Sequence, residues 1–131
     1  MGNPFVHIEL NTDDVANAKK FYKALFKWKF GPMGPAYTGI DVGAGTGGGM
    51  QKKPMPRAPT MWLPYVEVDD VKKTVAKARK LGAAVHVEFM EIGDMGAIGV
   101  IADPSGASLG VWEMAKKLKK AKKGARGKKS R

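Results

Sequence analysis

The sequence contains no cysteine and only two histidines in 131 residues. Without cysteine, the chain has no disulfide scaffold, no thiolate metal site and no cysteine nucleophile. It also lacks any apolar run that approaches the roughly 20 residues needed to span a bilayer. The opening segment, MGNPFVHIEL, has neither the basic nor the apolar region of a secretory signal. We therefore expect a cytoplasmic protein with no membrane span.

Acidic residues are missing from one end of the chain, and this accounts for most of the net charge of +11. Residues 116–131, KKLKKAKKGARGKKSR, hold ten Lys or Arg and no acid, which leaves thirteen basic and twelve acidic residues in the first 115. We expect this segment to be a disordered tail, which can bind DNA, RNA or an acidic membrane surface without sequence preference. The simpler interpretation is a terminus that only makes the protein more soluble. The segment contains no aromatic residue for base stacking. The body of the protein is close to neutral.

Glycine and proline are plentiful, with 17 and 8 residues, which favours short elements joined by turns over a helical bundle. The apolar pattern predicts the same order of elements twice, a strand, a helix and three strands. A proline-rich linker separates the two repeats. The predicted organisation is one domain at residues 1–115, with module one at 1–52, the linker at 53–61 and module two at 62–115.

The first predicted strand, residues 5–10, alternates between two kinds of side chain. Its aliphatic residues share one face, which we expect to lie in the core. His7 and Glu9 share the other face, which is expected to line a site. Asp14 and Asp70 each stand just before a predicted helix, where an aspartate can act as N-cap, so they mark corresponding positions of the two modules.

Three segments carry a resemblance to a known family: VHIELNTDDVANAKKFYKALF, WLPYVEVDDVKKTVAKARKLGA and IADPSGASLGVWE. Together they resemble the vicinal oxygen chelate superfamily, which includes glyoxalase I, bleomycin resistance proteins and extradiol dioxygenases. The resemblance covers residues 5–113 and is strongest to a small glyoxalase-like bacterial subgroup. It implies an α+β fold of two paired βαβββ modules whose sheets curl around a cleft. The modules pair within one chain or across a dimer, and we expect a homodimer.

Metal-dependent members of that superfamily use four ligand positions, one on the first and one on the last strand of each module. His7 matches the first-strand position of module one, and Leu63 matches its equivalent in module two. Gly49 and Gly110 match the two last-strand positions. Leucine and glycine offer no side-chain donor to a divalent ion. We therefore expect no metal centre and no cofactor.

The same alignment places a set of aromatic and small residues in phase with His7. These residues are Phe5, Gly49, Leu63, Tyr65, Gly110 and Trp112. We expect them to line a cleft that binds a small organic molecule with a planar or apolar part. His7 and Glu9 are the candidate catalytic residues, with Glu9 placed to tune the pKa of the imidazole. Three simpler interpretations stay open: a histidine without chemistry, a rim ion pair at Glu9, and aromatic packing against a partner subunit.

Three further residues have mainly structural interpretations. Trp62 is out of phase with the candidate site and is expected to pack in the core or at the rim. His86 is expected to be structural or exposed. Glu113 is expected to point away from Trp112, because neighbouring strand residues face opposite sides.

The favoured function is therefore a glyoxalase/bleomycin-resistance-like protein that binds a small organic molecule without the family metal. One alternative is a metal-dependent lyase, isomerase or dioxygenase that uses His7. A second alternative is a nucleic-acid-associated protein that acts through residues 116–131.

Overall fold

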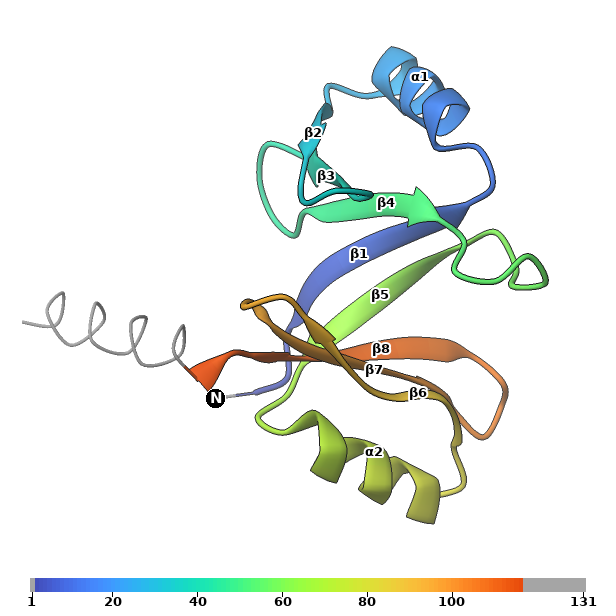
Figure 1. The fold of residues 1–131 in the computed structure, drawn as a ribbon, viewed down its shortest axis with the longest axis vertical. Helices are drawn as coiled ribbons and strands as arrows, with labels where there is room; N and C mark the ends of the chain where they lie inside the picture. Colours follow the sequence, from blue (N-terminus) through green and yellow to red (C-terminus); the bar gives the residue numbers. More distant parts are fainter. Residues whose placement is uncertain (1, 117–131) are drawn as a thin grey trace, which may run out of the picture. The chain divides into compact units, whose positions relative to one another are not determined.

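The computed structural model describes residues 2–116, so the predicted tail lies outside the described residues apart from its first residue. The order of elements is β-α-β-β-β, given twice (Figure 1). The elements are β1 (Phe5–Thr12), α1 (Val15–Leu25), β2 (Lys29–Pro32), β3 (Thr38–Asp41), β4 (Gly48–Lys52), β5 (Met61–Glu67), α2 (Val71–Lys80), β6 (Ala84–Ile92), β7 (Gly96–Ala102) and β8 (Ser108–Met114). This order confirms the predicted α+β class and the repeat. Neither helix is long and apolar enough to cross a membrane.

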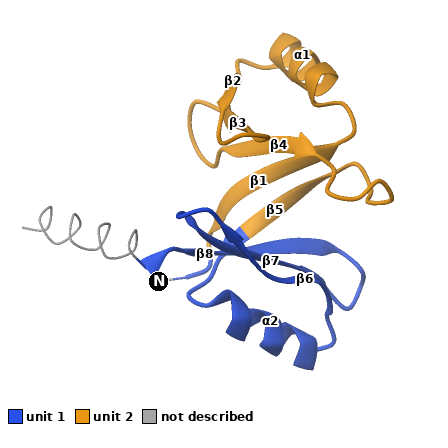
Figure 2. Cartoon of the chain, viewed as in Figure 1, with its two compact units in different colours: residues 1–3, 66–131 blue, residues 4–65 orange. Residues whose placement is uncertain are grey.

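The chain divides into two compact units, shown in different colours in Figure 2. Unit 2 is Pro4–Tyr65, and unit 1 is Met1–Asn3 with Val66–Arg131. β5 therefore begins in unit 2 and ends in unit 1. Within unit 1, Asn3 Nδ2 donates to the Glu67 carbonyl oxygen at 2.9 Å, which attaches the first described residues to the end of β5. The exact limits of the two modules and of the linker stay a prediction.

The strands of unit 2 follow the order β2-β3-β4-β1-β5, in which β1 and β4 are parallel and β2, β3 and β4 are antiparallel. The helix α1 begins after Asp14, whose side chain accepts a hydrogen bond from Asn17 N at 2.9 Å. It packs on one face of the sheet (Figure 1). The core there consists of Leu10, Ile40 and Met50, with Tyr22, Trp28 and Trp62 among the residues packed on it. Trp62 is partly buried and packs against this core, which agrees with the expected packing in the core or at the rim.

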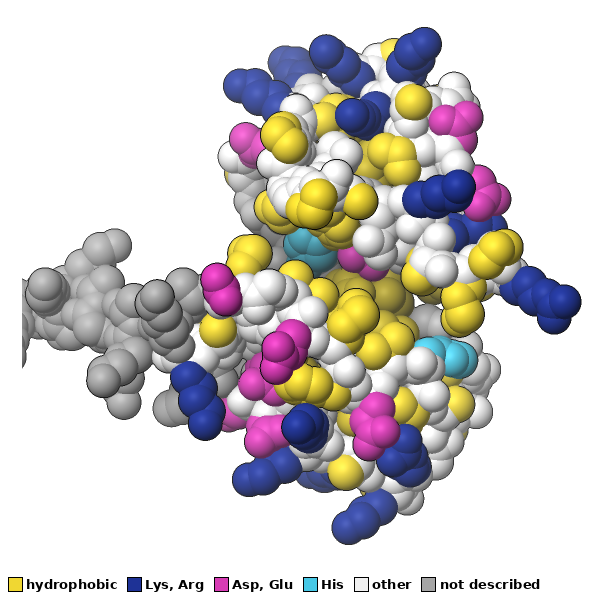
Figure 3. Space-filling model, viewed as in Figure 1, with side chains coloured by type: hydrophobic (Ala, Val, Ile, Leu, Met, Phe, Trp, Pro, Cys, Tyr) yellow, Lys and Arg dark blue, Asp and Glu magenta, His cyan; other side chains and the backbone are white. Residues whose placement is uncertain are grey.

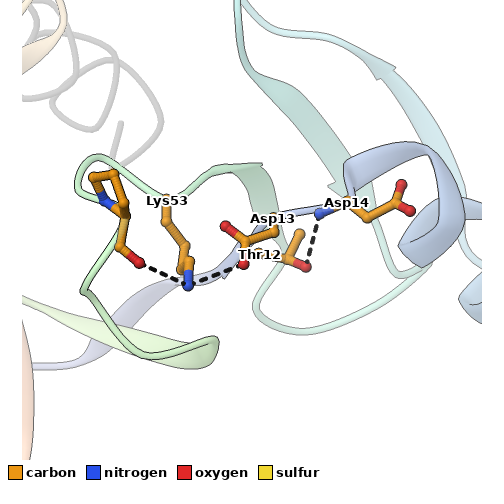
Figure 4. Close-up of polar contacts among 5 residues, drawn as sticks. Thr12, Asp13, Asp14 and Lys53 are labelled. Atoms are coloured by element: carbon orange, nitrogen blue, oxygen red, sulfur yellow. Dashed lines mark hydrogen bonds and ion pairs between the residues drawn. The ribbon is translucent and has the colours of Figure 1, made fainter.

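The segment that follows β4 is tied to the corner between β1 and α1 (Figure 4). Lys53 Nζ lies 3.1 Å from Asp13 Oδ2 and also donates to the Pro56 carbonyl oxygen at 3.4 Å. Its side chain is only 9% exposed. The backbone N–H of Lys53 donates to the Thr12 carbonyl oxygen at 3.1 Å. The beginning of the proline-rich linker is thus held against the rest of unit 2.

Unit 1 contains β8, β7 and β6, which pair antiparallel in that order. Its core is a valine cluster, in which Val71 and Val75 of α2 pack with Val68 and Val111. The pairing of β6 with β7 is irregular between Val85 and Val87, and His86 is exposed there, as expected.

Glu113 reaches from β8 to the start of α2. Its Oε1 accepts a hydrogen bond from Val71 N at 2.9 Å, while Asp70 Oδ1 accepts from Lys73 N at 3.0 Å. These two carboxylates satisfy N–H groups that the first turn of a helix leaves without partners. The side chain of Glu113 therefore points from β8 towards α2. This agrees with the expectation that it faces the opposite side of the strand from Trp112.

Replacing Glu113 by alanine removes one of these acceptors. We expect the free energy of unfolding to fall by about 1 kcal/mol, a typical cost for a lost helix cap. Urea denaturation followed by circular dichroism measures the change. Glu91→Ala, at an exposed residue of β6, is the matched control and should change stability little. Equal stability of both variants would contradict a capping role for Glu113.

Candidate functional site

The face of the unit 2 sheet that does not contact the Leu10 core carries a connected set of polar side chains. Alternation along β1 places His7, Glu9 and Asn11 on this side, opposite Leu10. Residues of β4, β5 and the loop before β3 join them through hydrogen bonds or strand pairing. We call this set the polar face of unit 2; it consists of His7, Glu9, Asn11, Tyr37, Gly49, Gln51 and Tyr65.

Glu9 is the centre of the polar face. It is only 8% exposed, and its carboxylate accepts three hydrogen bonds. Tyr37 donates to Oε1 at 2.9 Å, and Tyr65 and Asn11 each donate to Oε2 at 3.2 Å. Gln51 supports Asn11 from behind, with Nε2 donating to Asn11 Oδ1 at 3.1 Å. Hydroxyl and amide dipoles thus replace the water that a buried carboxylate loses.

No basic side chain within residues 2–116 forms an ion pair with Glu9. The ion pairs in this part of the chain join Lys53 to Asp13 and Arg79 to Glu88. The rim ion pair considered for Glu9 therefore does not occur among the described residues.

Tyr37 links Glu9 to His7, and the sequence did not single it out. Its hydroxyl oxygen lies 2.7 Å from His7 Nε2, in addition to its bond with Glu9. The rings of His7 and Tyr37 are stacked, with centroids 6.0 Å apart and an interplanar angle of 29°. Tyr65 presents its ring to His7 at 6.0 Å and 63°. Two phenol rings and one imidazole therefore surround the buried carboxylate.

Gly49 is what allows Tyr37 to lie there. In the sheet, Gly49 pairs with Glu9 on one side and with Gly39 on the other. A Cβ atom at position 49 would overlap the ring of Tyr37. We expected this glycine to line a cleft, and in the structure the Tyr37 ring occupies the space beside it.

The hydrogen bonds also assign the protons of the three central groups. A carboxylate only accepts, so the single proton of the Tyr37 hydroxyl is directed to Glu9. The Tyr37 oxygen is then the acceptor for His7, and His7 Nε2 must carry a proton. In a neutral imidazole the other nitrogen, Nδ1, keeps a free lone pair. His7 therefore presents an acceptor, or a base, at Nδ1.

Burial sets the protonation of these groups. It lowers the pKa of His7 below its usual 6.5, and the charge of Glu9 offsets this only in part. Burial also raises the pKa of both Tyr37 and Tyr65, and the neighbouring Glu9 raises it further. At neutral pH the imidazole is therefore uncharged, and both hydroxyls keep their protons.

The lowered pKa of His7 makes stability depend on pH. Below its usual pKa of 6.5, unfolded His7 takes up a proton that the folded protein resists. His7 thus stabilises the fold above that pH, and the stabilisation is lost as the pH falls through the folded-state pKa. In His7→Gln, the free energy of unfolding should fall less steeply than in the wild type between about pH 7 and 5.

Urea denaturation at several pH values measures this slope. His86→Gln removes the other, exposed histidine and should retain the wild-type slope. An unchanged slope in His7→Gln would show that His7 is not held uncharged by its surroundings.

The other predicted site residues are divided between the units. In unit 2, Phe5 is 59% exposed at the start of β1, and Leu63 of β5 is buried. Gly110 and Trp112 belong to β8 of unit 1. There Trp112 lies against Gly96, whose Cβ position would be 2.9 Å from the indole ring. A role for Gly110 and Trp112 beside the polar face stays a prediction.

A comparison with models of known protein families identifies the family of this chain. A model of the Glyoxalase/Bleomycin resistance protein/Dioxygenase superfamily matches residues 5–111. The chain belongs to this superfamily. The resemblance seen in the sequence is therefore confirmed.

Two curated superfamily relatives carry the name "Putative glyoxylase CFP32", one from Mycobacterium bovis and one from Mycobacterium tuberculosis. Each is 36% identical over 115 residues, which cover 81% of this chain and 44% of the relative. The chain thus spans less than half the length of the curated relatives it matches.

Solved structures support the superfamily fold. Hypothetical protein BH1468 from Bacillus halodurans C-125 matches with a TM-score of 0.68 and 10% identity, over 88% of this chain and 97% of that one. Methylmalonyl-CoA epimerase from Mycobacterium tuberculosis matches with a TM-score of 0.65 and 16% identity, over 87% and 89%. At these identities the likeness shows the fold alone.

The described residues do not supply the metal ligands that the superfamily resemblance implies. His7 Nε2 is bonded to Tyr37, and the ring of Tyr37 covers Gly49, which has no donor of its own. Among residues 2–116, no group of three or more His, Asp or Glu side chains is placed to hold a metal ion. The chemistry of the polar face is that of hydrogen bonds and aromatic rings.

Proposed function

We propose that this superfamily member binds a small organic molecule at the polar face of unit 2, without a metal ion. The observation that carries the proposal is the cluster of Glu9, Tyr37, His7 and Tyr65. Burying a carboxylate among aromatic hydroxyls costs free energy that an apolar core would not incur. Such arrangements are typical of ligand sites, where a few oriented polar groups lie among aromatic walls.

The ligand would approach through His7 and Tyr37, which are only partly buried. Stacked and edge-on rings provide flat surfaces for a planar or apolar group. His7 Nδ1 is the free acceptor and, if the protein is an enzyme, the proposed base, with Tyr37 and Glu9 holding its orientation. Phe5 and Leu63, which also belong to unit 2, complete the proposed lining. A homodimer in the cytoplasm remains our prediction.

The alternatives have less support. A metal-dependent lyase, isomerase or dioxygenase would need His7 Nε2 to leave Tyr37 and would need ligands at Leu63, Gly49 and Gly110. Nucleic-acid association would rest on residues 116–131, which lie outside the described residues apart from the first.

Nuclear magnetic resonance of ¹⁵N-labelled protein tests the proposal, with benzyl alcohol as a neutral aromatic probe and EDTA present throughout. We expect saturable amide shifts centred on the odd-numbered residues of β1 and on Gly49 and Gln51. His7→Ala should weaken binding, whereas His86→Ala should not. Shifts confined to the helix-covered side of unit 2, or equal binding by both variants, would overturn the proposal.

A further inference from the structure

Among the side chains of residues 2–116, none supplies a counter-charge to Glu9. Its three hydrogen-bond donors are all neutral, and His7, which lies beyond Tyr37, is uncharged at neutral pH. The basic side chains of unit 2 in Figure 3 lie over α1 and over the segment that follows β4. That helix packs on the face of the sheet opposite the polar face. The polar face therefore holds one negative charge that is solvated only by dipoles.

The rings beside Glu9 add negative potential of their own. The faces of aromatic rings attract cations, most strongly where water is excluded. Tyr37 and Tyr65 both have ring centroids 6.0 Å from that of His7, and both hydroxyls donate to the same carboxylate. A buried carboxylate among aromatic rings is the combination that suits an organic cation.

The directions of the hydrogen bonds within the polar face argue against an anionic ligand. The hydroxyl protons of Tyr37 and Tyr65 are directed to Glu9, and His7 Nε2–H is directed to Tyr37. What His7 offers a ligand is the lone pair of Nδ1. An anion needs hydrogen-bond donors, but the site offers it only this lone pair and the negative carboxylate, and both would repel it. A positively charged ligand with N–H donors would be attracted by both groups.

We infer that the ligand of the polar face is an organic cation, a protonated amine or amidine attached to a planar or apolar body. This inference rests on the proposed function and adds the charge of the ligand to it. The cationic group lies beside the partly buried rings of His7 and Tyr37, within the field of the buried Glu9, and one of its N–H groups donates to His7 Nδ1.

Three probes of similar size and different charge test the inference: benzylamine, benzyl alcohol and benzoate. Their dissociation constants are measured at pH 7 by amide shifts in the wild-type protein. We expect benzylamine to bind at least about tenfold more tightly than benzyl alcohol, and benzoate to bind most weakly.

The variant Glu9→Gln removes the charge while keeping the size of the side chain. It should bind benzylamine no more tightly than benzyl alcohol. Asp41→Asn makes the same charge change at an exposed residue of unit 2 and should keep the wild-type preference. Dispersed amide spectra show whether each variant is folded. If Glu9→Gln does not fold, the comparison of the three probes in the wild-type protein still tests the inference.

The outcomes separate the two proposals. Equal binding of the three probes, or tightest binding of benzoate, overturns the cation inference and leaves the proposed function standing. A preference for benzylamine that persists in folded Glu9→Gln also overturns the inference. Absence of saturable binding by all three probes overturns both.

Discussion

Gly49→Ala is expected to destabilise the protein by about 2–3 kcal/mol, the usual cost of overpacking a filled site. The new methyl group would overlap the Tyr37 ring, which must then move away from Glu9 and His7. Two results should therefore appear together. Urea denaturation should show the loss of stability, and imidazole resonances should show the pKa of His7 changed from its wild-type value.

Gly31→Ala is the matched control for this substitution. Gly31 also lies in a strand of unit 2, but a Cβ atom there meets nothing within 4 Å. We expect its stability to lie within about 0.5 kcal/mol of the wild type. If Gly49→Ala were as stable as Gly31→Ala, Tyr37 would not lie over Gly49.

Met50→Ala is expected to lower the free energy of unfolding by about 3 kcal/mol. Met50 is the neighbour of Gly49 in β4, but this substitution removes side-chain atoms from the core instead of adding a methyl group to the polar face. Met50 is fully buried, with 0% of its surface exposed, and packs with Leu10 and Ile40 beneath α1. Truncating a large core side chain removes buried apolar area and leaves a cavity. Because Met50 faces the other side of the sheet, the pKa of His7 should stay at its wild-type value.

The control for Met50→Ala is Met55→Ala, which truncates a methionine that is 65% exposed and should change stability little. Gly49→Ala should thus change both the stability and the pKa of His7, whereas Met50→Ala should change the stability alone. A shift of the His7 pKa in Met50→Ala as large as that in Gly49→Ala would show that the two faces are not independent.

The order of elements was predictable because each depends on local pattern. Alternation identified β1 and the direction of His7 and Glu9, and Asp14 and Asp70 marked the starts of the two helices. The end of β1 was placed two residues early, at Leu10 instead of Thr12, because the strand was expected to stop well before the helix cap at Asp14. Asn11 was missed for this reason, although it lies in phase with Glu9 and bonds to it.

Tyr37 could not be predicted from local pattern. It stands in a Gly-Pro-rich stretch just before β3, where no periodicity indicates the direction of a side chain. Its position depends on a long-range condition, the absence of a Cβ atom at Gly49 on the neighbouring strand. The superfamily resemblance drew attention to Gly49 as a vacant ligand position, whereas its physical role is to admit the ring that binds His7.

We propose that His7 is held by Tyr37 through a protonated Nε2, and not by a metal ion. His86→Gln leaves His7 as the only histidine, so its ring nitrogens can be observed alone in a long-range ¹H–¹⁵N correlation spectrum. We expect a neutral ring at pH 7 with the proton on Nε2, unchanged by EDTA or by one equivalent of Zn²⁺. A proton on Nδ1 instead, or ring nitrogens that shift on addition of Zn²⁺ or EDTA, would contradict it.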